Sequence, residues 1–333
     1  MIAGDMNSIE ILKTHGSKND IFIIESPYDR FPEEVDLVQL VRGICDRNGP
    51  LGGDGIYFVD HVDGVPEATF FNPDGSRADL CGNGMRCLGR YVLERRGETS
   101  TSIMSGRHRF VVRTAPETAG GVRQVSVDLP LVSFAAPRPI VAGSALWVDR
   151  SIPVLDSHLT FTALAVPNSH LVAIVDHYDE QELVRVGGIV ASDVDQFPIG
   201  ANVSFVYPVG PDEIFVRTYE RGVGLTPSCG SAVVASSAVY SRLAADTQQV
   251  SEITVRNAGG MAKVTLRSEN GELMPTLEGN ATFVYRADVA IDDILDAERE
   301  SFVQGESFPA EIAAYADLEN ENRAWLKEKG IYV

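Results

Sequence analysis

Two cysteines of this chain stand in the same local setting, far apart in the sequence. Cys81 lies in the segment DLCGNGMRC and Cys229 in PSCGSAVV, so each precedes a glycine and a small polar residue. Each segment follows several β-like runs and a glycine-containing turn, and then continues in a helix-like pattern. This repetition indicates an internal duplication that gives two similar α/β domains, each built around one central helix.

Short runs of strand-like composition flank both segments. In the first half they cover residues 9–15, 20–26, 55–62, 68–75 and 108–115, with a helical period over 32–49. In the second half they cover residues 159–166, 170–176, 201–209, 213–220, 252–257, 262–268 and 281–290. We therefore predict a first domain over 1–130 that is completed by a strand near 283–292, a second domain over 131–282, and an acidic helical extension over 293–333.

The composition narrows the class of protein. A chain of 333 residues is long enough for two domains, and its fractions of 44% hydrophobic and 23% charged residues are those of an ordinary globular protein. The formal net charge of −19 argues against binding to nucleic acid or to an anionic membrane, but not against a small anionic substrate. With no signal-peptide pattern and no bilayer-spanning apolar run, we expect a reduced, cytoplasmic protein.

The four cysteines could be structural, joined in a disulfide, metal ligands or catalytic groups. So few cysteines in so long a chain do not form a disulfide framework. Cys81 and Cys87 lack the C-x₂-C spacing of structural zinc sites, and no second thiol lies near Cys229 in the sequence, so we expect no metal. The GNG after Cys81 lacks the third glycine of a dinucleotide-binding fingerprint.

A cysteine at the first turn of a helix has distinctive chemistry. The positive end of the helix dipole and the free backbone N–H groups lower the pKa of the thiol, and such helix starts bind carboxylates. Two of them facing each other suit proton abstraction from one face of an α-carbon and delivery to the other. The alternative is that a free cysteine is a small buried apolar residue, which we favour for Cys45 and Cys87 but not for Cys81 and Cys229.

Five segments of the chain resemble those of the diaminopimelate epimerase family. The two most specific are FNPDGSRADLCGNGMRC (71–87) and YERGVGLTPSCGSA (219–232). THGSKNDIF (14–22), PNSHLVAIVD (167–176) and FPIGANVSF (197–205) follow the family's order and approximate spacing, so the resemblance covers roughly residues 8–290.

The resemblance implies a fold and an activity that the composition could not name. It implies an α/β (α+β) protein of two pseudo-symmetric domains, each a curled, mainly antiparallel β-sheet around a central helix, with the site in the cleft between them. It further implies conversion of LL-diaminopimelate to the meso form, in lysine and peptidoglycan precursor synthesis, without pyridoxal phosphate, other cofactor or metal. A cytoplasmic homodimer is expected on the same ground.

The resemblance also assigns roles to the residues that react. Cys81 and Cys229 would be the acid/base pair, one as thiolate and one as thiol, exchanging roles with the direction of reaction. His170 would partner Cys81, Glu220 would partner Cys229, and Arg221 would bind the distal carboxylate of the substrate through two parallel hydrogen bonds.

Further residues would bind the substrate. Asn72, Asn168 and Asn202 would hydrogen-bond its distal amino-acid end, where L-stereochemistry is read, and Asn19 would lie near the reacting end. The backbone amides at the two helix starts would receive a carboxylate; these belong to Gly82, Asn83, Gly230 and Ser231.

Three departures from the family pattern leave room for another substrate. Gly55 stands where a glutamine is common, Leu225 where glutamate is usual, and Ser169 replaces the proline of Asn-Pro-His. A related racemase for another amino acid, of the histidine or hydroxyproline type, is therefore the first alternative, although the proline-racemase branch usually has Cys-Gly-His at its first cysteine. A non-catalytic ligand-binding protein or thiol-redox switch is the second.

We predict that activity depends on reductant. If Cys81 and Cys229 both reach one α-carbon, oxidation can join them in a reversible, inactivating disulfide. Activity should be lost on oxidation and should return on addition of dithiothreitol, measured in parallel with a peptide map of the disulfide. Full activity after complete Cys81–Cys229 oxidation would contradict the shared site.

Overall fold

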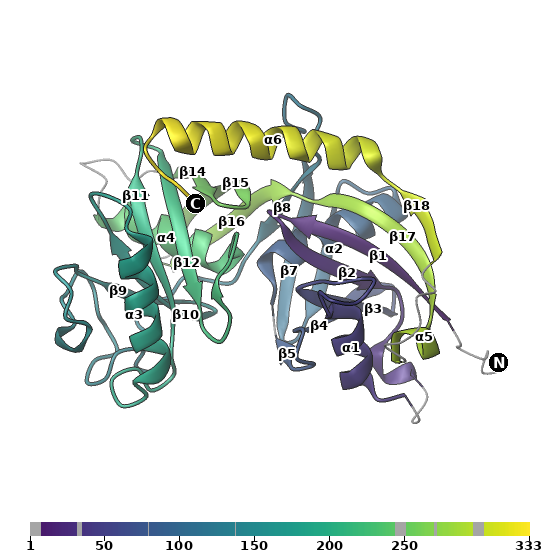
Figure 1. Ribbon diagram of the computed structural model, residues 1–333, viewed down its shortest axis with the longest axis horizontal. Helices are drawn as coiled ribbons and strands as arrows, with labels where there is room; N and C mark the ends of the chain where they lie inside the picture. The colour runs from purple at the N-terminus through teal and green to yellow at the C-terminus, as the bar shows by residue number, and fades with distance from the viewer. Residues whose placement is uncertain are drawn as a thin grey trace. The chain divides into compact units, whose positions relative to one another are not determined.

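The computed structural model describes residues 8–31, 35–78, 80–136, 138–243, 251–269, 272–295 and 303–333 (Figure 1). The fold divides into two compact units. Unit 1 comprises Met1–Val127 and Gly279–Leu318, and unit 2 comprises Asp128–Glu278 and Glu319–Val333. No described helix is long and apolar enough to cross a bilayer.

Unit 1 is a mainly antiparallel sheet curled around one helix. Its strands are β1 (Ser8–Gly16), β2 (Asn19–Ile24), β3 (Gly55–Val62), β4 (Val65–Phe71), β5 (Arg77–Ala78), β6 (Ser100–Ser105), β7 (His108–Ala115), β8 (Gln124–Asp128), β17 (Thr282–Ala290) and β18 (Val303–Ser307). Neighbours pair in the order β18–β17–β1–β2–β3–β4–β6–β7–β8, and only β2–β3 and β4–β6 are parallel. Helix α2 (Gly82–Arg96) contacts β1, β2, β6 and β7, so the sheet wraps around it.

Unit 2 repeats this plan. Its strands are β9 (Thr162–Val166), β10 (Asn168–Ile174), β11 (Asn202–Pro208), β12 (Glu213–Glu220), β13 (Gly224–Leu225), β14 (Glu252–Asn257), β15 (Gly260–Glu269) and β16 (Glu272–Asn280). They pair in the order β9–β10–β11–β12–β14–β15, with β10–β11 and β12–β14 parallel. Helix α4 (Gly230–Leu243) contacts every one of these six strands.

The two units match element by element. In each, an antiparallel pair leads to a helix, α1 (Leu37–Cys45) or α3 (Glu180–Ser192), and then to a second antiparallel pair. A two-residue strand, the central helix and a third antiparallel pair follow in both. The two parallel pairings also fall at equivalent places, which confirms the duplication predicted from the two cysteine segments.

The central helices are buried on all sides. Every residue of α2 from Gly82 to Leu93 is buried, as is every residue of α4 from Gly230 to Tyr240. The buried part of α4 consists mainly of apolar and small residues, whereas α2 also buries Asn83, Arg86 and Arg90, whose polar groups therefore need partners inside the unit. Helix α2 ends at Gly97, whose φ of 66° is the left-handed conformation that suits glycine after a helix.

Several elements differ from the sequence-based expectation. The helix expected over 32–49 is shorter, since α1 begins after Asp36, whose carboxylate accepts from the N–H groups of Val38 and Gln39. Strand β6 and helix α3 were not predicted; α3 contains two adjacent glycines, which lower helix propensity. Gly187 has no room for a side chain, because a Cβ there would lie 2.4 Å from the Tyr219 ring.

The C-terminal extension is not helical throughout. It contains α5 (Ile291–Leu295), strand β18 and the long helix α6 (Pro309–Glu328), whereas residues 296–302 lie outside the described part of the chain. In unit 1, Glu311 of α6 accepts two hydrogen bonds from the Arg90 guanidinium, and Tyr315 is 1% exposed. In unit 2, Leu326 and Ile331 pack against Phe215. Two short 3₁₀ helices, Tyr28–Arg30 and Pro153–Leu155, complete the fold.

We predict that Glu311→Gln destabilises unit 1. Arg90 is 7% exposed, and the loss of its charged partner leaves much of its charge to the exposed Glu94 alone. The free energy of unfolding in urea should fall by about 2 kcal/mol, the usual value of hydrogen bonds to a charged group. Glu328→Gln, at the exposed end of the same helix, is the matched control and should change it by less than about 0.5 kcal/mol. Equal effects would contradict an anchoring role for Glu311.

Candidate active site

Cys81 is the N-cap residue of α2. Its carbonyl oxygen accepts the first helical hydrogen bond, from Met85 N, and its Sγ accepts from Gly84 N at 3.4 Å. The Sγ also contacts Asn19 Oδ1 at 3.4 Å as a donor. The thiol is partly exposed, in contrast to the buried Cys87 further along the helix. The structure therefore places the side chains of Cys81 and Asn19 together at the start of α2.

Tyr57 is a neighbour of Cys81 that the sequence did not reveal. From β3, its hydroxyl oxygen accepts from Cys81 N at 3.1 Å and donates to Cys81 O at 3.3 Å. Burial raises the pKa of Tyr57 well above its ordinary value, so the phenol stays protonated and fixes the backbone of Cys81. In the sequence, Tyr57 looks like any aromatic residue of a buried strand.

Two further predicted residues of unit 1 are held by local contacts. Asn72 stands in the turn after β4, where its Nδ2 donates to Ser76 Oγ at 3.0 Å. Asn83 is 3% exposed, and its Oδ1 accepts from Arg86 at 3.1 Å. The side chain of Asn83 is thus engaged inside the unit, and only its backbone amide, with that of Gly82, belongs to the helix start.

The predicted residues of unit 2 gather at the ends of neighbouring strands. His170 on β10 lies opposite Asn202 on β11, and Asn168 stands two residues before His170. Asn202 Oδ1 accepts from the backbone N–H of Arg221, which follows β12. The Arg221 guanidinium is exposed and donates to Ile199 O. Residues from three separate segments of the sequence therefore lie together at one end of strands β10, β11 and β12.

The imidazole of His170 is neutral in this arrangement. It is fully buried, and burial lowers its pKa to about 3. Its Nε2–H donates a hydrogen bond to Asn168 Oδ1 at 3.0 Å, whereas the buried Nδ1 has no hydrogen-bond partner among the described residues. His170 therefore presents an unused acceptor at Nδ1 rather than a positive charge.

Cys229 begins α4 as Cys81 begins α2. Its carbonyl oxygen accepts from Val233 N at 2.9 Å, and its Sγ lies 3.5 Å from Ser231 Oγ. Burial raises the pKa of Cys229 well above its ordinary value, and the charge of Glu220 and a hydrogen bond to it act in the same direction. Thr226 Oγ1 donates to Glu220 Oε1 and holds that carboxylate. Cys229 and Glu220 are therefore neighbours in unit 2, and this surrounding favours the protonated form of the Cys229 thiol.

The predicted residues thus form two groups, one in each unit. Unit 1 holds Asn19, Asn72, Cys81, Gly82 and Asn83; unit 2 holds Asn168, His170, Asn202, Glu220, Arg221, Cys229, Gly230 and Ser231. The pairing of Cys81 with His170, and that of Cys81 with Cys229, joins residues of different units and stays a prediction.

The absence of glutamine at position 55 has a packing reason. A Cβ on Gly55 would lie 2.3 Å from the Phe70 ring, so the aromatic side chain occupies the space that any side chain at position 55 would need. The Phe70 ring in turn packs on Tyr57, with centroids 4.9 Å apart. An aromatic cluster next to Cys81 therefore takes the place of one polar contact.

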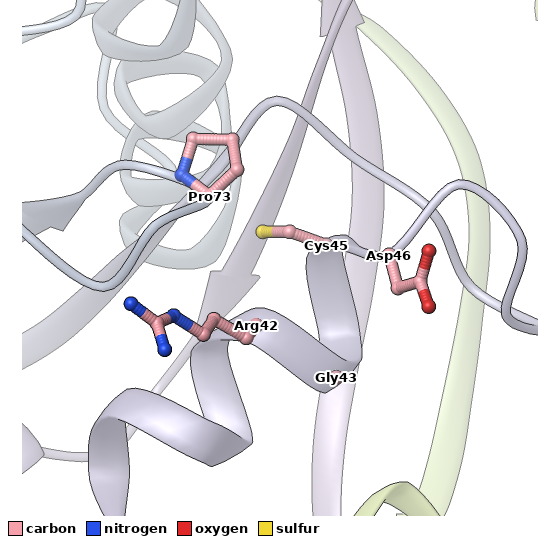
Figure 2. A pocket seen from close by; sticks show the side chains of 5 residues that line it. All are labelled: Arg42, Gly43, Cys45, Asp46 and Pro73. Carbon is pink, nitrogen blue, oxygen red and sulfur yellow. The ribbon is translucent and has the colours of Figure 1, made fainter. Parts of the chain in front are cut away.

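A surface pocket in unit 1 lies at the end of α1 and contains none of the predicted site residues. It is lined by Arg42, Gly43, Cys45, Asp46 and Pro73 (Figure 2). Burial raises the pKa of the Cys45 thiol to about 12, so this cysteine is not a nucleophile at neutral pH. No group of three or more potential metal ligands occurs among the described residues.

Comparison with known proteins identifies the family. The model of the family described as "Diaminopimelate epimerase" matches residues 11–119 and 162–284, one segment in each half of the chain. The chain belongs to the diaminopimelate epimerase family. A diaminopimelate epimerase from Enterococcus faecalis is 38% identical over 303 residues, which cover 88% of this chain and 93% of that protein. One from Ligilactobacillus salivarius is 37% identical over 318 residues, covering 92% and 97%.

Solved structures confirm the two-domain epimerase fold. A phenazine biosynthesis protein of the PhzF family from Bacillus anthracis has a TM-score of 0.60 at 16% identity and covers 85% of this chain and 99% of its own. A hydroxyproline epimerase from Agrobacterium vitis has a TM-score of 0.59 at 14% identity, with coverage of 88% and 93%. At such low identity, the similarity to these two proteins concerns the fold alone.

We predict that Glu220→Gln makes Cys229 more reactive. Glu220 raises the pKa of this thiol, so removal of the negative charge should lower the pH midpoint of its alkylation. The measurement is the rate of iodoacetamide modification of Cys229 against pH, followed by peptide mass spectrometry. Glu252→Gln, an exposed carboxylate of the same unit, is the matched control. An unchanged or raised midpoint in Glu220→Gln would contradict the assigned pairing.

Proposed function

We propose that this chain is a cofactor-independent epimerase that converts LL-2,6-diaminopimelate to the meso form. One observation supports this most strongly: each unit presents one partly exposed cysteine at the start of its buried central helix. The family and the names of the relatives supply the substrate. Its place in lysine and peptidoglycan precursor synthesis, in the cytoplasm and as a homodimer, belongs to the same proposal.

The reaction needs one thiolate and one thiol on opposite faces of the α-carbon. Cys229 rests protonated for the reasons given above, which makes it the proton donor and leaves Cys81 as the base. The Cys81 thiolate removes the α-proton, the electron pair enters the adjacent carboxylate, and Cys229 delivers a proton to the other face. The backbone N–H groups at the helix starts of α2 and α4 stabilise the charge that develops on the carboxylate.

The partners of the two thiols act differently. Glu220 keeps the proton on Cys229 until substrate arrives, because a thiolate beside a carboxylate is disfavoured. His170 is neutral, so it would accept a hydrogen bond through Nδ1 from the Cys81 thiol that forms once the α-proton has been removed, rather than act as a cationic partner.

Arg221 and the three asparagines at positions 72, 168 and 202 would bind the distal end of the substrate. The exposed Arg221 can bind a second carboxylate through two parallel hydrogen bonds, a geometry that arginine favours. Asn202 orients the backbone of Arg221, and Asn168 and Asn72 lie at the ends of their strands with polar groups available. A substrate with only one carboxylate would leave the guanidinium without its ligand.

We predict α-deuterium incorporation when the protein is incubated with LL-diaminopimelate in deuterated water. Exchange should fall by at least about a hundredfold in Cys81→Ala and in Cys229→Ala, since each removes a general acid or base. Cys87→Ala in the buried part of α2 is the control and should retain most of the exchange. The measurement is mass spectrometry of the recovered amino acid together with chiral separation of its isomers.

The same experiment separates the alternatives. Exchange with histidine or a hydroxyproline, but none with LL-diaminopimelate, would replace the proposed substrate with that of a related racemase. No exchange with any amino acid would contradict catalysis and leave a binding protein or redox switch. Gly55 and Leu225, which depart from the family pattern, are the positions that make the first of these comparisons necessary.

A further inference from the structure

Arg86 is a buried cation that has no carboxylate partner among the residues that the structure describes. It lies in α2, five residues after Cys81, and is 0% exposed. Its guanidinium donates to three neutral oxygens: Asn83 Oδ1 at 3.1 Å, Asn280 O at 3.1 Å and Ser17 Oγ at 3.3 Å. Across the described ranges, no aspartate or glutamate forms an ion pair with it. Since an unpaired buried charge is costly, this arrangement calls for a reason.

The fold makes room for this guanidinium. A Cβ on Gly16 would lie 2.9 Å from Arg86 Nη2, and a Cβ on Gly279 would lie 3.0 Å from Arg86 Nε. Two glycines from opposite ends of the sequence therefore line the space that the side chain fills. A side chain at position 16 or 279 would collide with the guanidinium, so the space beside α2 fits an arginine at position 86 only because both positions are glycine.

Arg86 and Asn280 together hold the turn between β1 and β2. Asn280 Oδ1 accepts from Ser17 N at 2.7 Å, while Arg86 donates to the Ser17 hydroxyl, so the residue is held from both sides. Ser17 and Lys18 have φ of 53° and 63°, the left-handed conformation that non-glycine residues adopt at a cost. The surrounding contacts must offset that cost.

This turn places Asn19 against Cys81. The pair Gly16–Asn19 closes the two-residue hairpin loop, so the conformation of Ser17 and Lys18 fixes where Asn19 lies. Its Oδ1 contacts Cys81 Sγ. A chain of contacts thus runs from Arg86 through the turn to the thiol, and every member belongs to unit 1.

Arg86 also acts on Cys81 through its charge. Among the ionisable groups that interact with it electrostatically are Cys81, Cys87 and Tyr315. Burial raises the pKa of Cys87 and keeps it a thiol, and Cys81 is the partly exposed one of the two cysteines. Among the described residues, other ionisable groups in this region include Tyr57 from β3, and His15 of β1 and Lys18 of the following turn, both against Tyr315 of α6. The charges of Arg90 and Asp20 also act on Cys87.

The duplication shows that this cation is particular to the first helix. Five residues after Cys229, the position equivalent to Arg86 is the buried Val234. Nine residues before each cysteine stand Asn72 in unit 1 and Glu220 in unit 2. The first thiol thus has a cation where the second has valine, and an amide where the second has a carboxylate.

We propose that Arg86 is a positioning residue for Cys81. It holds the Ser17–Lys18 turn, and with it Asn19, in place beside the sulfur atom, and its positive charge favours the thiolate form of Cys81. The link to a proton-transfer step rests on the proposed function. The effect of Arg86 on the reactivity of the Cys81 thiol does not rest on the proposed function, so this reactivity is measured first, without substrate.

The test compares Arg86→Met with Arg86→Lys. Iodoacetamide modification of all four cysteines is followed against pH by peptide mass spectrometry. In Arg86→Met, the alkylation midpoint of Cys81 should rise by about one pH unit, with the rate near neutral pH falling about tenfold, while that of Cys229 stays unchanged. Arg86→Lys keeps the charge and should restore most of the midpoint.

The alkylation of the two buried thiols, those of Cys45 and Cys87, shows in the same experiment whether a variant is folded. Cys45 and Cys87 should stay unreactive in a folded variant. If these two thiols react in Arg86→Met, that variant is misfolded and two others decide. In Arg86→Lys, which keeps the charge, the proposal requires an alkylation midpoint of Cys81 close to that of the parent protein. In Asn280→Ala, which changes no charge, it requires slower turnover with little change in KM. An unchanged Cys81 midpoint and rate in folded Arg86→Met would overturn the proposal, whether or not the protein epimerises diaminopimelate.

Discussion

Burial of a helix on all sides is the constraint on which this structure depends. Helices α2 and α4 are buried on all sides, so a sheet must curl around each of them, and the chain supplies that sheet from strands before and after the helix. The last turn of each helix is partly exposed, as is the residue that precedes the first turn. A residue at this position combines free backbone amides with partial exposure, and in both units it is a cysteine.

The sequence predicts this arrangement because its signals are local. Cysteine, glycine and a small polar residue before an apolar helical run describe a helix start, and strand-like runs on both sides describe the sheet. β3 and β7 have the bounds expected from the sequence, residues 55–62 and 108–115. The assigned roles of Asn72, Asn168, Asn202 and Arg221 came instead from the family resemblance, because an asparagine at the end of a strand looks like a turn residue.

What the sequence could not show depends on contacts between distant segments. Tyr57 and Cys81 are joined through a hydroxyl group that resembles any core tyrosine, and Arg86 meets Asn280 across most of the chain. The charged residues Arg90 and Glu311 look like solvated surface until α6 brings them together. Periodicity reports which face of an element is buried, but not which polar atoms meet there, so these partners could be found only in the structure.

A duplicated fold gives two helix starts of the same geometry, but two-base chemistry needs them in opposite protonation states. In the proposed mechanism, different neighbours of the two cysteines would meet this requirement while the two helices stay alike. Glu220 disfavours charge on Cys229, whereas the first helix carries Arg86 where the second has Val234. The duplicated backbone would then supply the two acid/base groups, and the difference in a few neighbouring side chains would set which of them rests as thiolate. A duplication with identical neighbours would leave two thiols of equal pKa and no assigned base.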